Sequence, residues 1–390
     1  MPALVNPFVA ATGSPPIPEA QAWARRYDGA HGPLLDLSQA VPGKPPHPAM
    51  LEALSAAAGS PDAARYGPIL GDAVLREAYA AEMSATYGAS LSANEVAITA
   101  GCNLAFVATA MLIAQAGDAV LLPTPWYFNH QMSLAMLGIE PRPLPCHAEA
   151  GFVPDSREAE RLIDERTRAI VLVTPNNPTG AIYPEEVLEG FAALCRRRDL
   201  WLIVDETYRD FLPAGLNRPH GLFTAPDWGD NLVQLYSFSK SHGIPGHRLG
   251  AMTAGRDVIG EVAKTLDCLQ ICAARTAQRP VAEGITGLRA WREANRDEIT
   301  RRASAFRAAF ADLPGWTVGS VGAYFAYVRH PFAGRTAAQV AERLAAERGV
   351  LGLPGSYFGP GQEDHLRLAF ANVAAERLAE IPTRLASFTV

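Results

Sequence analysis

The segment Leu232-Val-Gln-Leu-Tyr-Ser-Phe-Ser-Lys240 decides the fold class of this chain. It begins as a largely apolar run and ends in polar residues. Comparable apolar runs occur at Val96–Thr99, Ala119–Leu122, Ala169–Val173, Trp201–Val204 and Leu249–Thr253. Strands that are apolar on both faces are typical of a mainly parallel sheet sandwiched between helices. The sequence therefore predicts an α/β fold.

The chain of 390 residues is long enough for more than one hydrophobic core, and its residue composition and pattern change twice along the sequence. Residues 1–47 are rich in proline and glycine, with one helical patch at Glu19–Tyr27, and we expect an N-terminal arm that lies over another surface and starts the small domain. Residues 48–284 alternate strands with helices and should form a large domain. Residues 285–390 should form a smaller α+β domain.

Three helices are expected from local patterns. In Pro184–Arg198, Pro184 would take the first helical position, with acidic residues in the first turn and arginines in the last. Trp291–Leu313 and Thr336–Arg348 are long segments rich in alanine and arginine. They flank the strand-like stretches Gly322–Val328 and Leu366–Phe370.

Composition argues against several classes of partner and location. A net charge of −6 disfavours nucleic acid and anionic membranes. The five cysteines show no paired spacing, so we expect reduced thiols in a cytoplasmic protein and no metal site. The N-terminus has no basic region typical of a signal peptide. The 22 uncharged residues Val96–Gly117 should form a buried strand and helix, not a membrane span.

Polar residues gather where the predicted strands end. In open parallel sheets, ligands bind beyond the carboxyl ends of the strands. The polar clusters that follow the first five runs are Thr99–Asn103, Pro123–Tyr127, Thr174–Gly180, Asp205–Tyr208 and Ser237–Lys240, and His247-Arg248 precedes the last run. These clusters predict one site at one edge of the sheet.

Lys240 stands at the centre of this predicted site. It is one of only three lysines and directly follows a buried strand. A desolvated amine with a lowered pKa is what imine formation with an aldehyde needs. Asp205 ends an uncharged strand, so its carboxylate must be paired, and a carboxylate facing a pyridine nitrogen keeps that nitrogen protonated.

Other residues suit the remaining groups of such a cofactor. A phosphate dianion could be held by Ser237, Arg248 and the backbone amides of Cys102 and Asn103 at a helix N-terminus. Asn177 and Tyr208 can donate hydrogen bonds to a phenolate oxygen. Together these features point to pyridoxal 5′-phosphate (PLP).

The motifs resemble those of the class I/II aminotransferases of PLP-dependent fold type I, from about Asp36 to Asn372. The resemblance rests on Tyr66-Gly67, Gly71, Leu75-Arg76-Glu77, Asn177-Pro-Thr-Gly180, Asp205-Glu-Thr-Tyr208, Ser237-Phe-Ser-Lys240, Arg248 and Leu366-Arg367-Leu368. It implies a PLP-dependent aminotransferase that moves an amino group from an L-amino acid to a 2-oxo acid.

The resemblance also implies roles for individual residues. Lys240 would carry PLP as an internal aldimine and move a proton, Asp205 would pair with the pyridine nitrogen, and Tyr208 would assist. The cofactor-binding set would be Tyr66, Gly101, Cys102, Asn103, Tyr127, Asn177, Asp205, Tyr208, Ser237, Lys240 and Arg248. The substrate would meet Arg367, Asn177 and Ala40. Tyr66 would reach the phosphate of the other subunit, so the chain should be a homodimer with shared sites.

Some points stay open at this level. Ala40 stands where many relatives have glycine, which places a methyl group near the substrate carboxylate. The adjacent Trp126 leaves the stacking role of Tyr127 uncertain by one position. The resemblance predicts cis bonds at Asn177–Pro178 and Thr124–Pro125. The amino donor is not identified; charged residues that could lie in its pocket are Asp267, Arg275 and Arg279.

Two other functions compete with transamination. A C–S β-lyase or another quinonoid-based reaction on an amino acid would share the same motifs. A non-catalytic effector-sensing domain of this fold would carry a DNA-binding domain before the match. Only about 35 residues precede it here, without a basic helix-turn-helix pattern.

Overall fold

The six apolar runs all become strands of one seven-stranded sheet in the computed structural model, which describes residues 4–216 and 218–390. The strands are β2 (Val96–Thr99), β3 (Ala119–Thr124), β4 (Glu140–Pro145), β5 (Thr167–Val173), β6 (Trp201–Asp205), β7 (Leu232–Ser237) and β8 (Gly250–Ala254). Their order is β2-β8-β7-β6-β5-β3-β4. Only β8 runs in the direction opposite to the other six strands, so the prediction of a mainly parallel sheet is confirmed.

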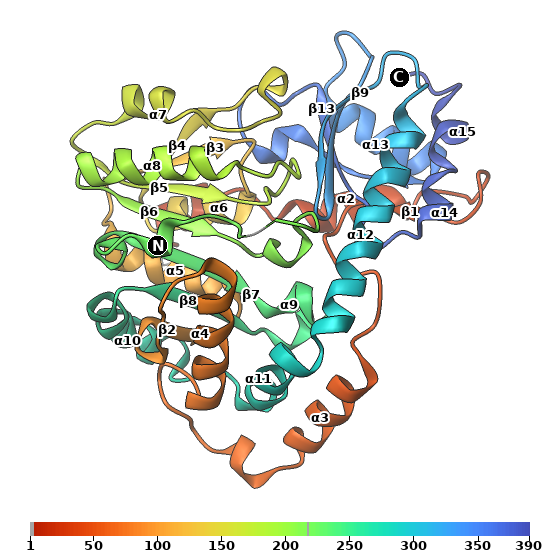
Figure 1. Ribbon diagram of the computed structural model, residues 1–390. Helices are drawn as coiled ribbons and strands as arrows, with labels where there is room; N and C mark the ends of the chain where they lie inside the picture. Colours follow the sequence, from red (N-terminus) through yellow and green to blue (C-terminus); the bar gives the residue numbers. More distant parts are fainter. Residues whose placement is uncertain (1–3, 217) are drawn as a thin grey trace.

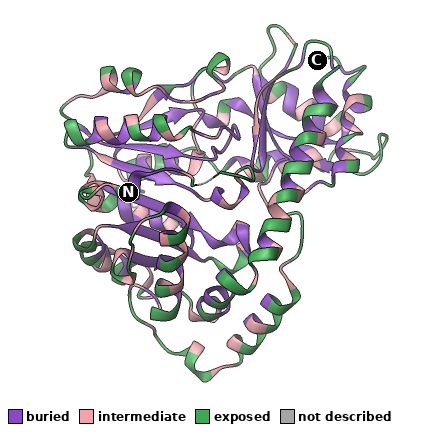
Figure 2. Cartoon of the chain, viewed as in Figure 1, coloured by how far each residue is buried: buried purple, intermediate pink, exposed green. Residues whose placement is uncertain are grey.

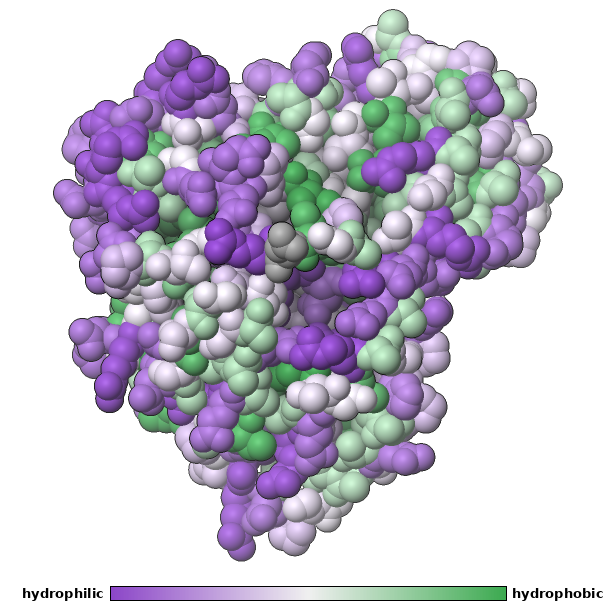
Figure 3. Space-filling view, viewed as in Figure 1, coloured by the Kyte–Doolittle hydropathy of each residue, from purple (hydrophilic) through white to green (hydrophobic). Residues whose placement is uncertain are grey.

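Helices cover both faces of this sheet (Figure 1). They are α4 (Ala73–Tyr87), α5 (Cys102–Ile113), α6 (Phe128–Met136), α7 (Ser156–Leu162), α8 (Glu185–Arg197), α10 (Arg256–Gln270) and α11 (Gln278–Gly287). Successive strand residues point to opposite faces, so Ile170 and Leu172 belong to one buried apolar cluster and Ala169 and Val171 to the other. Figure 2 shows the strands buried beneath helices with exposed outer faces. The surface over α7 is strongly hydrophilic (Figure 3).

The uncharged stretch and the start of α8 can be compared with the sequence predictions. Val96–Gly117 forms β2 and α5, as predicted, and no helix in the described ranges is long and apolar enough to cross a bilayer. Pro184 was expected at the first helical position, and this is wrong: it is the N-cap of α8, with ψ of 152°. The helical conformation begins one residue later, at Glu185.

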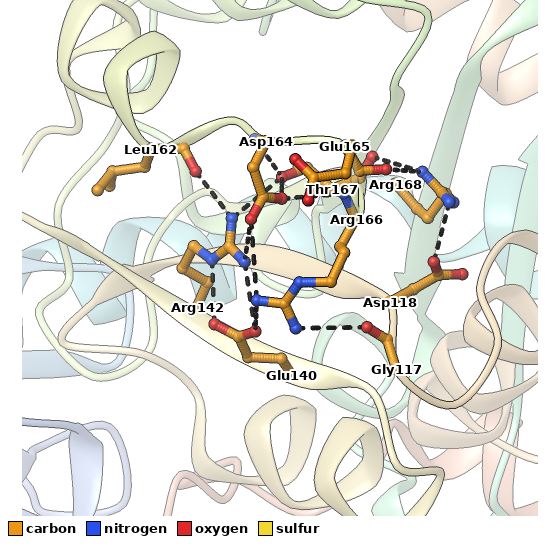
Figure 4. Close-up of polar contacts among 10 residues, drawn as sticks. All are labelled: Gly117, Asp118, Glu140, Arg142, Leu162, Asp164, Glu165, Arg166, Thr167 and Arg168. Atoms are coloured by element: carbon orange, nitrogen blue, oxygen red, sulfur yellow. Dashed lines mark hydrogen bonds and ion pairs between the residues drawn. The ribbon is translucent and has the colours of Figure 1, made fainter.

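The edge strand β4 escaped the sequence analysis because its residues, Glu140-Pro-Arg-Pro-Leu-Pro145, are not an apolar run. Proline is tolerated at a sheet edge, where one row of backbone groups needs no ladder partner. At the amino end of the sheet, Arg142 lies 2.9 Å from Asp164 and 3.1 Å from Glu140, and it donates to the Leu162 carbonyl (Figure 4). These contacts tie β4 to the loop before β5.

A second sheet has four antiparallel strands, in the order β12-β13-β10-β9. Its strands are β9 (Thr317–Gly322), β10 (Phe325–Arg329), β12 (Leu353–Pro354) and β13 (His365–Ala369), and the helices beside it are α12 (Arg289–Phe310), α13 (Ala337–Arg348), α14 (Ala375–Leu378) and α15 (Ile381–Leu385). The expectation of one strand over Gly322–Val328 is wrong, because the chain turns at Ala323, where φ is 44°. A side chain on Gly322 would collide with the Gly180 backbone, so the hairpin packs tightly against the loop after β5.

The N-terminal arm packs on its own chain more than its composition suggests. It contains α1 (Pro7–Ala11), α2 (Pro16–Ala24) and β1 (Leu35–Asp36), and α3 (Pro48–Ala58) follows. The helix α2 starts and ends three residues before the predicted patch. Ala20, Leu35 and Leu37 are fully buried, and β1 pairs with β11 (Val350–Leu351). These buried residues show that part of the arm packs on its own chain. The first three residues of the arm lie outside the described ranges.

Candidate active site

The strand ends meet at a pocket of about 250 Å³ beyond the carboxyl edge of the large sheet. It is lined by Cys102, Asn103, Tyr127, Val173, Asn177, Asp205, Thr207, Tyr208, Ser237, Ser239, Lys240, Pro245 and Arg248. Most residues predicted for the site are therefore brought together. The exceptions are Ala40, Gly101 and Arg367, which lie next to lining residues, and Tyr66, which lies elsewhere.

Lys240 lies in the short helix α9 (Phe238–Ser241), directly after β7. Its amine donates a hydrogen bond to the Ala40 carbonyl and lies 5.9 Å from the centre of the Tyr208 ring. Within the described ranges it has no ion pair with a carboxylate. Burial, helped by the charges of Arg248 and Arg367, lowers the pKa of Lys240 to about 8. About a tenth of the amine is therefore the free base at pH 7, far more than for an ordinary exposed lysine.

Asp205 at the end of β6 is the buried carboxylate of the pocket, with 3% of its surface exposed. One oxygen lies 3.2 Å from Nε2 of His130, and the other accepts from the Thr207 amide at 2.9 Å. Burial alone would raise the pKa of Asp205, but His130 and Thr207 outweigh it and hold the pKa below its ordinary value. The carboxylate stays ionised, as a partner for a protonated ring nitrogen must.

His130 is the partner that the sequence analysis left open. It lies on α6 one turn after Tyr127, and its ring stacks on Phe106 at 3.9 Å between centroids. The expectation that Asp205 must be paired holds, and the available clue was that His130 comes three residues after Tyr127, the N-cap of α6.

A concave cradle forms where α5 begins. Gly101 has φ of 88°, and a side chain there would collide with the Arg248 guanidinium. A side chain on Gly250 would meet the backbone of Gly101 and Cys102. Ser239 Oγ is buried and has no hydrogen-bond partner among the described residues. A helix N-terminus beside an arginine and an unpaired hydroxyl group suits a phosphate dianion.

The adjacent aromatic residues Trp126 and Tyr127 lie in different surroundings. Tyr127 lines the pocket, and its hydroxyl donates to Asn103 Oδ1 at 3.4 Å. Burial, the largest effect, raises the pKa of Tyr127 to about 12, so the phenol stays neutral. Trp126 packs toward Gly359 instead. Tyr127 is therefore the aromatic ring available to a ligand in the pocket.

Arg367 reaches the pocket from β13 in the second sheet. It is 2% exposed, donates to Asn177 Oδ1 at 3.2 Å and to the Ser38 carbonyl, and its Nε has no partner among the described residues. Burial lowers the pKa of Arg367 to about 10, which still leaves it charged at neutral pH. A buried guanidinium with a free donor suits a carboxylate ligand.

Several predicted features fall outside the pocket of this chain. Tyr66 is 80% exposed. Arg275 pairs with Asp72 at 3.1 Å, and Arg279 pairs with Glu283 at 3.7 Å. The cis bonds expected at Thr124–Pro125 and Asn177–Pro178 are present, and Thr174–Pro175 is a third that was not expected.

Comparison with known proteins agrees with this geometry. Residues 33–385 match the sequence profile described as aminotransferase class I and II. The chain belongs to this family. It is 30% identical to arginine–pyruvate transaminase AruH of Pseudomonas aeruginosa, over 82% of this chain and 81% of that protein. It is 29% identical to aromatic aminotransferase ISS1 of Arabidopsis thaliana, over 90% and 88%.

The fold agrees as well. A structure of aspartate aminotransferase from Thermus thermophilus with maleate superposes with a TM-score of 0.89 at 27% identity, covering 98% of this chain and 99% of that one. The aminotransferase described here uses PLP and transfers amino groups between amino acids and 2-oxo acids. Its pocket fits that cofactor, because a buried amine, a buried carboxylate and a glycine-lined cradle lie around one cavity.

Proposed function

We propose that Lys240 is the residue of this aminotransferase that binds PLP covalently and carries the proton of the transfer step. The observation that supports this most directly is its buried amine, which has no carboxylate partner in the described part of the chain and lines the pocket that contains Asp205. Bound PLP supplies an aldehyde that captures amines and a ring that withdraws electrons. The lysine amine, close to half deprotonated near pH 8, can accept and return a proton within the same pocket.

The other residues hold the cofactor in position. Asp205, kept ionised by His130 and Thr207, would keep the ring nitrogen protonated, and Tyr127 would cover one face of the ring. Asn177 and Tyr208 would donate to the 3′-oxygen. The phosphate would be bound by Gly101, Cys102, Asn103, Ser237 and Arg248, where the cradle lies.

The substrate carboxylate would bind Arg367. Its planar guanidinium can give two parallel hydrogen bonds, and the free Nε leaves one of these available. Asn177, which accepts from Arg367, would align it, and Ala40 would border the carboxylate from the arm. This arrangement recognises the group common to all α-amino and 2-oxo acids, and the side chain of the donor is left to other residues.

The active unit would be a homodimer with shared sites. Tyr66 is exposed, and so are the apolar side chains of Leu51, Ile69 and Val74 on either side of it in the sequence and of Ile271 after α10. Exposed apolar side chains that gather in one patch favour association. Tyr66 of one chain would then reach the phosphate bound in the other.

We further propose the division into an arm and start of the small domain (1–47), a large PLP-binding domain (48–284) and a small domain (285–390). A cytoplasmic location is supported by the five cysteines, all free thiols in this structure.

Reduction with borohydride tests the role of Lys240. Wild-type protein incubated with PLP and then reduced should carry one pyridoxyl group, located at Lys240 by peptide mass spectrometry. Lys240→Ala should carry none, and Lys264→Ala, which alters an exposed lysine paired with Glu261, should label normally. Labelling of Lys240→Ala at another lysine would disprove the assignment. A panel of amino donors with wild-type enzyme would then identify the substrate class.

A further inference from the structure

A chain of buried hydrogen bonds lies behind the turn that carries Lys240. Ser241 Oγ lies 2.8 Å from the Tyr236 hydroxyl, which donates to Asp210 Oδ2 at 2.6 Å. On the other side, Ser241 Oγ lies 3.0 Å from Nδ1 of His242. Tyr236, Ser241 and His242 are each at most 2% exposed. This relay (Asp210, Tyr236, Ser241, His242) does not touch the pocket but includes the residue directly after Lys240.

The direction of each hydrogen bond in the relay follows from its acidic end. The charges of Arg209 and Arg292 outweigh burial and lower the pKa of Asp210, so its carboxylate only accepts. Tyr236 must then donate to Asp210 and accept from Ser241. The Ser241 oxygen is left to accept from Nδ1–H of His242. Burial, the largest effect, lowers the pKa of His242 to about 4, so the ring is neutral and this tautomer is available.

The relay is anchored to α12, the helix that runs from the large sheet to the second sheet (Figure 1). Arg292 on α12 donates to Asp210 Oδ1 at 2.9 Å and to Glu82 on α4 at 2.9 Å. Further along the same helix, Arg302 donates to the Ala371 carbonyl, directly after the second sheet. A cavity of about 20 Å³ is lined by Lys240 together with Trp291 and Arg302 of α12. Lys240 on α9 therefore faces α12 across this small cavity.

The short helix that carries Lys240 needs such an anchor. The helix α9 has only four residues, too few for a stable turn without tertiary contacts. A buried hydroxyl that loses its partner is costly, so each member of the relay restricts the next. The cation above the Tyr236 ring, Arg209 at 4.4 Å, fixes that ring as well.

We propose that this relay positions the amine of Lys240, and that Arg292 couples this position to α12. These are positioning residues, since none of them lines the pocket. The inference rests on the proposed role of Lys240. Its test is separate, because borohydride labelling of Lys240 examines that role alone.

The variant Tyr236→Phe tests the relay, because it keeps the ring under Arg209 and removes only the hydroxyl. We expect kcat to fall about tenfold while KM for the amino donor changes less than about twofold. In the apoprotein, the pH midpoint for acylation of the Lys240 amine, followed by mass spectrometry, should rise by about half a unit, since a looser turn admits water. The charges facing this amine, Arg248 and Arg367, are unchanged in the variant.

Tyr79→Phe is the matched control. Tyr79 is equally buried, its ring stacks on Tyr236 at 5.3 Å, and its hydroxyl bonds Gln234 outside the relay. It should leave kcat and the Lys240 midpoint unchanged. Tyr236→Phe could instead lose thermal stability but keep the wild-type kcat and the wild-type pH midpoint for acylation of Lys240, as we expect of Tyr79→Phe. In that case the inference is wrong. Ser241→Ala, a smaller change, gives the same decision should Tyr236→Phe fail to fold.

Discussion

Arg367 and Asn177 share a hydrogen bond of 3.2 Å although they come from different sheets. Arg367 lies in β13 of the small sheet, and Asn177 lies in the loop after β5 of the large sheet. The bond joins the guanidinium proposed for the substrate carboxylate to the amide proposed for the cofactor oxygen. If these proposed roles hold, the bond would couple the substrate and cofactor sites across the junction between the two sheets.

Replacing Arg367 should therefore weaken the binding of every substrate to a similar extent. In Arg367→Lys the charge stays but the bidentate fork is lost, so we expect kcat/KM to fall about a hundredfold for amino donors and 2-oxo acids alike. Steady-state kinetics with two unrelated donors would measure this. Arg329→Lys, at the exposed end of the neighbouring strand β10, should behave as wild type. A loss of kcat/KM confined to one donor would show that Arg367 recognises the side chain of that donor and not the carboxylate.

The lowered pKa of Lys240 predicts how cofactor capture depends on pH. Only the free amine attacks an aldehyde, and burial lowers the pKa of this amine to about 8. The rate at which apoprotein captures PLP should therefore rise as the pH increases through about 8 and level off above it. Stopped-flow absorbance of the bound cofactor would follow the rate. A rate that still climbs steeply toward the ordinary lysine pKa of 10.5 would contradict this prediction.

Shared sites in a homodimer predict complementation between two inactive variants. Tyr66→Ala and Lys240→Ala should each be inactive alone, because one lacks a phosphate ligand and the other the covalent anchor. In a mixed dimer, one site inherits both changes and the other inherits neither. Co-expression with two different affinity tags, followed by tandem purification, should return partial activity. Purified mixed dimers without activity would place Tyr66 in its own subunit's site.

The contacts of Arg142 predict a purely structural effect (Figure 4). Arg142→Ala removes the donor shared by Glu140, Asp164 and the Leu162 carbonyl, and should lower the free energy of unfolding by about 1–2 kcal/mol. Urea denaturation would measure it, and kcat should not change because this edge of the sheet is opposite the pocket. Arg157→Ala, whose side chain is 84% exposed beside Asp155, is the control and should have little effect.

The sequence alone determined the large sheet and the polar residues at its carboxyl edge. Apolar runs and the turns that end them are local patterns, so the strands, Lys240 and Asp205 could be located without coordinates. The strand β4 could not, because its pairing with β3 and its ion pairs come from distant residues.

Tertiary structure alone decided which distant residues meet. His130 reaches Asp205 from α6, Arg367 reaches Asn177 from another sheet, and Arg292 reaches Asp210 from α12. No local pattern encodes these pairs. They form because packing two sheets and a connecting helix together buries charged groups, and buried charges must find partners.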